Sequence, residues 1–291
     1  MPNQHQCKIC LKEALLVQIL AEKQNAHIYQ CQQCKSYFAD PAPTKEYLKE
    51  MYANSSMNED AGAERLDSQG ELIIPNWKAE EVKTNASILN KYRGGRESLL
   101  DIGCFWGIFL SQVKSSFKVT GLEIWPPALE YLTKKNIPAI EGTLDTVDTE
   151  HAYDIITMFD VLEHVYDLDA SLQKIHTLLN KDGLFLVSVP NAAGLWPAIL
   201  HGIKQRLRSK TWDPLPYPFH LYYYTLKGLR QAFLRNGLQP IFYTTRSTHA
   251  ATEKAHKLSW FRKMIINAFS ILGASINQGD RLILLAKKSS A

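Results

Sequence analysis

The sequence predicts an α/β protein in which helices cover both faces of a parallel sheet, preceded by a small metal-binding ribbon. First, apolar stretches of strand length alternate with amphipathic helical patterns from residue 98 onward. Second, a glycine turn joins a buried strand to a helix within residues 99–110. Third, two Cys-x-x-Cys sequences lie in the first 34 residues. The first two features predict the sheet, and the third predicts the ribbon.

Length and composition allow one large domain with a smaller one. The chain has 291 residues, of which 45% are hydrophobic and 21% charged, as in ordinary globular proteins. The net charge of +4 is mild, and the only basic cluster lies at 204–210, so a dedicated nucleic-acid binder is disfavoured. Neither a leader sequence nor a run of 18 apolar residues is present, which predicts a cytoplasmic protein.

The cysteine pairs predict a structural zinc site. Twenty residues separate the two pairs, and two thiolate-bearing turns facing each other form a tetrahedral cage suited to Zn²⁺. A complete set of four thiolates leaves no open position for catalysis. Unliganded or redox-active cysteines are the alternative. The expected ligands are Cys7, Cys10, Cys31 and Cys34.

Turn-forming residues and changes in composition predict three segments. Residues 1–40 form the ribbon, with short strands at 15–19 and 27–30. Residues 41–75 form a linker or lid, with a helix at 45–52 and a polar loop at 53–70. The main domain is 76–291, and it opens with an amphipathic helix at 76–92.

The main domain alternates strands and helices. The strands are expected at 98–102, 117–123, 137–141, 153–159, 184–189, 238–245 and 281–286, and the helices at 108–114, 126–135, 168–179 and 225–236. A proline- and aromatic-rich insertion at about 191–220 leaves the end of a strand, where open α/β sheets bind ligands, so it is expected to cap the site. Residues 253–276 are expected to be helical. Within them, 258–276 could contact a membrane surface, although a core or dimer helix is the better expectation.

The central turn excludes two common nucleotide sites. The P-loop pattern is absent, and the dinucleotide pattern fails because Phe105 and Ile108 stand where glycines are required. What remains is an acid-x-Gly-x-x-x-Gly sequence at 101–107, with Glu123 at the end of the next strand. A carboxylate at that strand end suits two ribose hydroxyls. An acid at the first strand end suits a ligand that carries an ammonium and a sulfonium.

These sequences resemble a known family. Residues 100–107 are similar to motif I of class I S-adenosylmethionine-dependent methyltransferases, and 119–123 to their second motif. Residues 153–165, 183–191 and 220–225 resemble the ubiquinone-methyltransferase-like branch. The resemblance covers about 80–287, and the cysteine pairs with residues 37–41 resemble the deoxysugar C-methyltransferases of this branch. It implies a Rossmann-like, seven-stranded, mostly parallel sheet.

The resemblance also implies roles for individual residues around S-adenosylmethionine. The turn would hold the methionine end, Glu123 the ribose, and the residues after the second and third strands the adenine. Phe159 and Asp160 would lie near the transferred methyl group. We expect Phe105 to have an ordinary backbone conformation, with its ring turned away. The cofactor-binding set is Asp101, Gly103, Cys104, Phe105, Gly107, Glu123, Ile124, Thr143, Leu144, Phe159 and Asp160.

His164 and His220 are the candidate catalytic bases. Removing a proton from the acceptor near neutral pH suits histidine; a packing or capping role is the alternative for His164. The predicted function is methyl transfer to a small-molecule acceptor, such as a sugar or sugar-like metabolite. The alternatives are an RNA methyltransferase whose ribbon holds RNA, and a cofactor-binding scaffold without activity. The sequence leaves the acceptor and the oligomeric state open.

Overall fold

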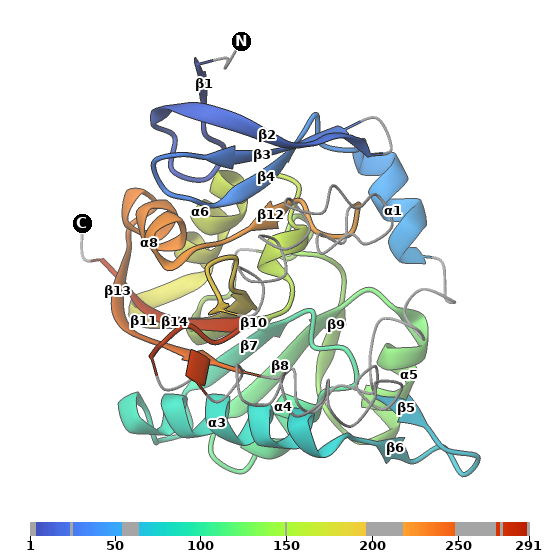
Figure 1. Ribbon diagram of the computed structural model, residues 1–291. Helices are drawn as coiled ribbons and strands as arrows, with labels where there is room; N and C mark the ends of the chain where they lie inside the picture. Colours follow the sequence, from blue (N-terminus) through green and yellow to red (C-terminus); the bar gives the residue numbers. More distant parts are fainter. Residues whose placement is uncertain are drawn as a thin grey trace.

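The computed structural model describes residues 4–23, 26–53, 64–148, 150–195, 218–247, 272–273 and 276–289. Figure 1 shows a small sheet from the N-terminal part lying above a larger sheet. Most of the expected cap (196–217), the basic cluster at 204–210 and nearly all of 258–276 lie outside the described residues. Among the helices that are described, none is both long and apolar enough to cross a membrane.

The larger sheet has seven strands in the order β13-β14-β11-β10-β7-β8-β9. Neighbours from β11 through β9 pair in parallel, whereas β14 runs antiparallel to both β11 and β13. The predicted seven-stranded, mostly parallel sheet is therefore confirmed. The strands are β7 (Ser98–Ile102), β8 (Lys118–Glu123), β9 (Ala139–Glu141), β10 (Tyr153–Phe159), β11 (Leu179–Pro190), β13 (Leu238–Arg246) and β14 (Arg281–Lys288).

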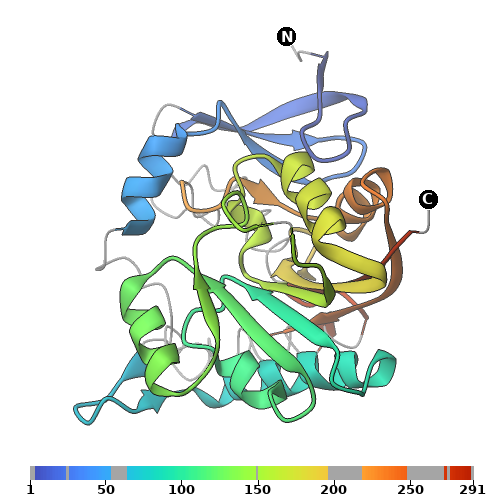
Figure 2. The ribbon, with the colours of Figure 1, turned by 180° about the vertical axis from the view of Figure 1, so that it is seen from behind.

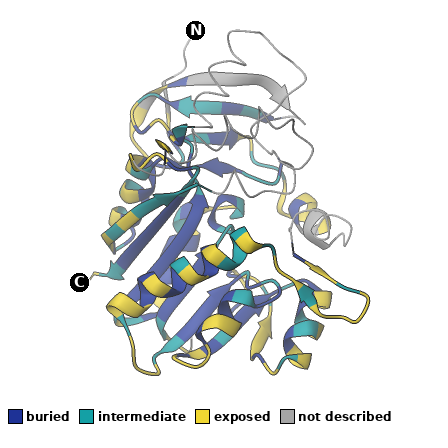
Figure 3. Ribbon diagram, turned by 60° about the horizontal axis from the view of Figure 1, so that its bottom comes forward, coloured by how far each residue is buried: buried dark blue, intermediate teal, exposed yellow. Residues whose placement is uncertain are grey.

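Helices cover both faces of this sheet because its strands are apolar on both sides. Leu99 of β7 packs in the cluster formed with α3 (Asn76–Tyr92), α4 (Ile108–Val113) and α5 (Pro126–Lys134). The next residue, Leu100, packs in the opposite cluster with α6 (Leu168–Leu178) and α8 (Leu226–Arg235). This alternation follows from the two-residue period of a strand. Figure 3 shows the buried strands beneath helices whose outer faces are exposed.

The N-terminal sheet is completed by a strand from the far end of the chain. Its order is β1-β2-β3-β4-β12, in which β12 (Tyr222–Tyr223) pairs antiparallel with β4 (Tyr37–Asp40). The other members are β1 (Gln4–Gln6), β2 (Glu13–Lys23) and β3 (Ala26–Cys31). Helix α1 (Lys45–Ala53) follows this sheet. The strand pairing thus joins the cysteine-bearing segment to the main domain.

Hydrogen bonds reinforce this junction at the start of α8. Thr225 donates its backbone N–H to Ser36 Oγ (3.0 Å) and its hydroxyl to the carbonyl of Cys34 (2.6 Å). A Cβ on Gly228 would lie 2.2 Å from Ser36 Oγ, so the two segments approach as closely as glycine allows. Both segments belong to one hydrophobic core. Figure 2 shows the N-terminal strands lying over α6 and α8.

The polar stretch expected to be a loop contains a small hairpin. β5 (Arg65–Leu66) pairs antiparallel with β6 (Leu72–Ile73). Asp67 Oδ1 accepts the backbone N–H groups of Gln69 (2.8 Å) and Glu71 (2.9 Å), which stabilises the turn. Alternating apolar residues are too few here for a sequence pattern to reveal a strand.

Candidate active site

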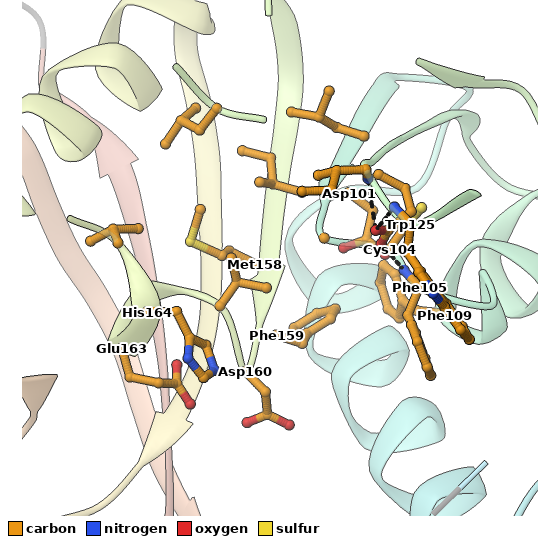
Figure 4. A pocket seen from close by; sticks show the side chains of 18 of the residues that line it. Asp101, Cys104, Phe105, Phe109, Trp125, Met158, Phe159, Asp160, Glu163 and His164 are labelled. Atoms are coloured by element: carbon orange, nitrogen blue, oxygen red, sulfur yellow. Dashed lines mark hydrogen bonds between the residues drawn. The ribbon is translucent and has the colours of Figure 1, made fainter. Parts of the chain in front are cut away.

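A cavity of about 930 Å³ opens at the carboxyl ends of β7, β8 and β10. β8 and β9 follow β7 on one side of it, whereas β10 pairs with its other side, so the direction of strand addition reverses at β7 and a crevice forms there. Figure 4 shows Asp101, Phe105 and Trp125 on one side of the cavity and Glu163 and His164 on the other. Phe159, at the end of β10, lies between the two groups.

The turn after β7 has a left-handed backbone at three positions, with φ values of 69° at Gly103, 47° at Phe105 and 67° at Gly107. A Cβ on Gly103 would lie 2.5 Å from Val161 Cγ2, and one on Gly107 would lie 2.4 Å from Leu132 Cδ2. The two glycines are therefore required both for their φ values and for close packing.

The expectation for Phe105 was wrong. Its backbone has a positive φ instead of an ordinary conformation, and the residue borders the cavity. A left-handed non-glycine residue costs roughly 1–2 kcal/mol. Two contacts offset this cost: its N–H donates to Glu123 Oε2 (2.8 Å), and its ring stacks on Trp125 at 5.1 Å with an interplanar angle of 15°. Neither partner is adjacent to Phe105 in the sequence, so local propensity could not reveal the conformation.

Glu123 is fixed in place by the backbone. Besides Phe105, the N–H groups of Ile124 (2.7 Å) and Trp125 (2.9 Å) donate to its Oε1, and the residue is only 8% exposed. A carboxylate has about four acceptor positions, so three amides orient it and leave capacity for a hydroxyl donor in the cavity.

Asp101 is buried at the end of β7. Thr157 Oγ1, on the neighbouring strand β10, donates to its Oδ1 at 2.6 Å. Burial raises the pKa of Asp101 to about 7, although the Thr157 hydrogen bond and the charge of Lys78 oppose the increase. A carboxyl group in this state gains from a cationic ligand, because a nearby positive charge stabilises its ionised form.

The other predicted cofactor residues also border the cavity, except Gly107, which is not among its lining residues. Ile124, Thr143 and Leu144 line the end beyond Glu123. Cys104 lines it too, but burial raises the pKa of its thiol, which argues against a reactive thiolate. A Cβ on Gly121 would lie 2.5 Å from Cys104 Sγ, so this sulfur fills the space beside β8.

Asp160 belongs to a charged cluster that sequence analysis missed. Its carboxylate pairs with Arg281 of β14, and Oδ2 lies 3.8 Å from Lys78 Nζ of α3. Lys78 Nζ also lies 3.7 Å from Glu81 Oε1 and 3.9 Å from Glu64 Oε1. Lys78 and Glu81 are ordinary charged residues in a helical pattern, and no local signal shows that they face a cavity.

The two candidate bases lie together on the opposite wall. His164 ends a short 3₁₀ turn (Leu162–His164), and its Nδ1–H donates to the carbonyl of Phe219 (2.5 Å). The ring centroids of His164 and His220 are 4.7 Å apart. Burial lowers the pKa of both imidazoles, so both are neutral at physiological pH.

Glu163 joins this pair and was not predicted. It is 1% exposed, and burial raises its pKa to about 8, with the charge of Asp160 adding to the increase. Neither of its oxygens has a hydrogen-bond partner among the described residues. Its position next to His164 was the only signal available in the sequence.

The four N-terminal cysteines form a second, separate cluster. All are buried, and their sulfurs lie within 4.8 Å of one another, with Cys7–Cys34 at 3.8 Å and Cys10–Cys31 at 3.9 Å. A tetrahedral zinc with bonds of about 2.3 Å requires sulfur separations of about 3.8 Å. The backbone N–H groups of Ile9 and Cys34 donate to the sulfurs of Cys7 and Cys31. The donor set and its geometry fit zinc.

Residues 76–241 match a protein family described as "Methyltransferase domain", over more than half of the chain. The chain belongs to this family. The methyltransferase is also 23% identical over 119 residues to the ubiquinone biosynthesis O-methyltransferase of Rickettsia prowazekii (strain Madrid E). That match spans 38% of this chain and 45% of the relative, so less than half of the relative is represented.

Solved structures agree on the fold. Magnesium protoporphyrin IX methyltransferase from Synechocystis PCC 6803 aligns with a TM-score of 0.56 and 14% identity, over 84% of this chain and 100% of the other. The 1,6-didemethyltoxoflavin-N1-methyltransferase from Burkholderia thailandensis aligns with a TM-score of 0.54 and 14% identity, over 93% and 98% of the two chains. At these identities, the comparison establishes the fold of S-adenosylmethionine-dependent methyltransferases.

Proposed function

We propose that this methyltransferase transfers the methyl group of S-adenosylmethionine to a small, hydroxylated acceptor, such as a sugar or sugar-like metabolite. The observation that carries the proposal is Glu123, oriented by three backbone amides at the strand end beside the left-handed turn. Its carboxylate is held in a fixed position, where the family resemblance predicts hydrogen bonds to the ribose hydroxyls of the cofactor. Both structural neighbours, from Synechocystis and Burkholderia, contain bound S-adenosylhomocysteine.

The cavity would divide into a cofactor half and an acceptor half. Glu123 would bind the ribose, Asp101 and the turn would hold the methionine end, and Ile124, Thr143 and Leu144 would surround the adenine. Phe159 lies between the walls and would border the sulfonium methyl group. Because the sulfonium is already activated, holding acceptor oxygen, methyl carbon and sulfur in line supplies much of the rate.

The acceptor half supports a polar small molecule. Its wall carries Asp160, Glu163, His164, His220 and Arg281, all groups that hydrogen-bond hydroxyls. A cavity of about 930 Å³ lies near the upper end of the roughly 300–1,000 Å³ typical of small-molecule sites. That volume suits a cofactor together with a compact acceptor. His164 and His220 are the proposed proton acceptors on this wall.

Affinity for S-adenosylmethionine is expected to fall between about pH 8 and about pH 6. Asp101, with a pKa of about 7, must lose its proton to face the cationic methionine end. The loss approaches about tenfold for each pH unit below the pKa. In Thr157→Val, a hydrogen bond that lowers this pKa is gone, so the fall is expected at higher pH. Calorimetric titration across this pH range measures the affinity of the unchanged protein and of Thr157→Val, with the exposed Thr177→Val as control. Identical pH profiles for Thr157→Val and Thr177→Val would contradict the role assigned to Asp101.

We further propose that Cys7, Cys10, Cys31 and Cys34 hold one structural zinc ion. Four buried thiols at the right separations support this, and a closed shell of four sulfurs leaves no position for a substrate. The zinc would stabilise the sheet that includes β12, just after His220 in the acceptor half.

Methyl transfer tests the proposed function. Purified protein is incubated with methyl-labelled S-adenosylmethionine and a panel of nucleotide-linked sugars, other hydroxylated metabolites and RNA. We expect labelled product and S-adenosylhomocysteine with a hydroxylated small molecule. Label transferred only to RNA would overturn the proposed acceptor class. Failure to bind either cofactor form in calorimetry would overturn the proposed enzyme activity.

A further inference from the structure

The acceptor wall brings three potential metal ligands together. A carboxylate oxygen of Glu163 and one ring nitrogen from each of His164 and His220 all lie within 4.8 Å of one another. They come from two distant segments, the turn after β10 and the residues just before β12. All three line the cavity. Figure 4 shows Glu163 and His164 across the cavity from Asp101.

No hydrogen bond from the described residues offsets the cost of burying the Glu163 carboxyl group. Both oxygens are without a hydrogen-bond partner in the described part of the chain, where Glu163 also forms no ion pair. Leaving a buried polar group unsatisfied is destabilising, and leaving a charged group unsatisfied is more so. Nδ1 of His220 is likewise buried and has no partner among the described residues. A cation between these groups would satisfy both.

The orientation of His164 suits metal binding. Its Nδ1–H donates to the carbonyl of Phe219, which fixes the tautomer and the orientation of the ring. Metal-binding imidazoles generally donate their other N–H to a carbonyl or carboxylate in this way.

The two cationic side chains that line the cavity in the described part of the chain are paired with other acids. Arg281 is close enough to influence Glu163 and His220, but its guanidinium pairs with Asp160. Lys78 lies among Glu64, Glu81 and Asp160. The acids that line the cavity thus outnumber its two cationic side chains, and the excess negative charge favours an additional cation.

We propose that Glu163, His164 and His220 bind one divalent transition-metal ion, distinct from the zinc of the cysteine cluster. Two imidazoles and a carboxylate suit Zn²⁺, Mn²⁺, Fe²⁺ or Co²⁺ better than Mg²⁺ or Ca²⁺, which prefer oxygen ligands. Three protein ligands leave coordination positions for an oxygen of the acceptor.

The role of this ion rests on the proposed function. Binding to the ion lowers the pKa of an acceptor hydroxyl, which releases its proton to solvent. The oxygen then forms a bond to the methyl carbon while the carbon–sulfur bond breaks, and that electron pair stays on sulfur in S-adenosylhomocysteine. With the ion bound, the imidazoles act as its ligands and no longer as the proton acceptors proposed above, and the acceptor oxygen is held where the methyl group arrives.

Titration with Mn²⁺ tests the site, because Mn²⁺ binds thiolate sites poorly. Full-length protein carrying one zinc per chain is titrated, and free Mn²⁺ is followed by electron paramagnetic resonance. We expect one saturable Mn²⁺ per chain, and at least tenfold weaker binding in Glu163→Gln and in His220→Gln. The exposed residues Glu130 and His151 provide control variants, Glu130→Gln and His151→Gln, which should bind Mn²⁺ as the unchanged protein does.

Circular dichroism shows that each variant is folded, and S-adenosylhomocysteine binding is measured on the same samples. Absence of saturable Mn²⁺ binding in the unchanged protein would overturn the metal site. Unchanged Mn²⁺ affinity in folded Glu163→Gln and His220→Gln would overturn it as well. If Mn²⁺ binds as expected but no cofactor form binds, the metal site stands and the proposed function fails.

Discussion

Glu123→Ala is expected to weaken binding of S-adenosylhomocysteine by about 100-fold or more. The substitution removes the proposed ribose contact and leaves three backbone N–H groups without their acceptor. Hydrogen bonds to a charged group contribute about 1.5–3 kcal/mol each. The left-handed conformation of Phe105 also loses the hydrogen bond to Glu123, one of the two contacts that stabilise it, so the backbone of the turn is expected to change conformation.

Isothermal titration calorimetry with S-adenosylhomocysteine measures this effect. Glu141→Ala is the matched control, because Glu141 pairs in register with Glu123 on the adjacent strand and is exposed. Glu123→Gln keeps one acceptor oxygen and is expected to show an intermediate loss. Wild-type affinity in Glu123→Ala, or an equal loss in Glu141→Ala, would contradict the ribose assignment.

Cys31→Ser is expected to destabilise the whole methyltransferase and to abolish zinc binding. Structural zinc contributes about 10–16 kcal/mol in small zinc-binding peptides, as much as the net stability of about 5–15 kcal/mol of a typical domain. The cysteines share a hydrophobic core with Phe185 of β11 and Phe233 of α8. Loss of the metal is therefore expected to destabilise the larger sheet as well.

Zinc content by mass spectrometry and thermal unfolding with bound S-adenosylhomocysteine measure this effect. Cys104→Ala removes a thiol outside the cluster and should leave the zinc content unchanged. Zinc retained in Cys31→Ser would contradict the ligand assignment. Loss of zinc with an unchanged unfolding midpoint would contradict coupling through the shared core and would favour an independent ribbon at 1–40.

The order and type of most elements can be predicted from local sequence patterns. Strand and helix periodicities are local, because each depends on which side chains a short segment must bury. The strand at 98–102, the helix at 76–92 and the strand at 153–159 were predicted with the bounds observed. Gly103, Gly107 and the paired cysteines were also recognisable, because a turn and a metal site each require particular residue types at fixed spacing.

Contacts between residues far apart in the chain become visible only in the folded structure. The fold paired β12 with β4, placed His220 beside His164 and Glu163, and brought Lys78 and Arg281 to Asp160. It also set the backbone of Phe105, through Glu123 and Trp125. These outcomes depend on contacts between residues far apart in the chain, whose geometry follows from the packing of whole elements. Periodicity and spacing within one segment carry no information about that packing.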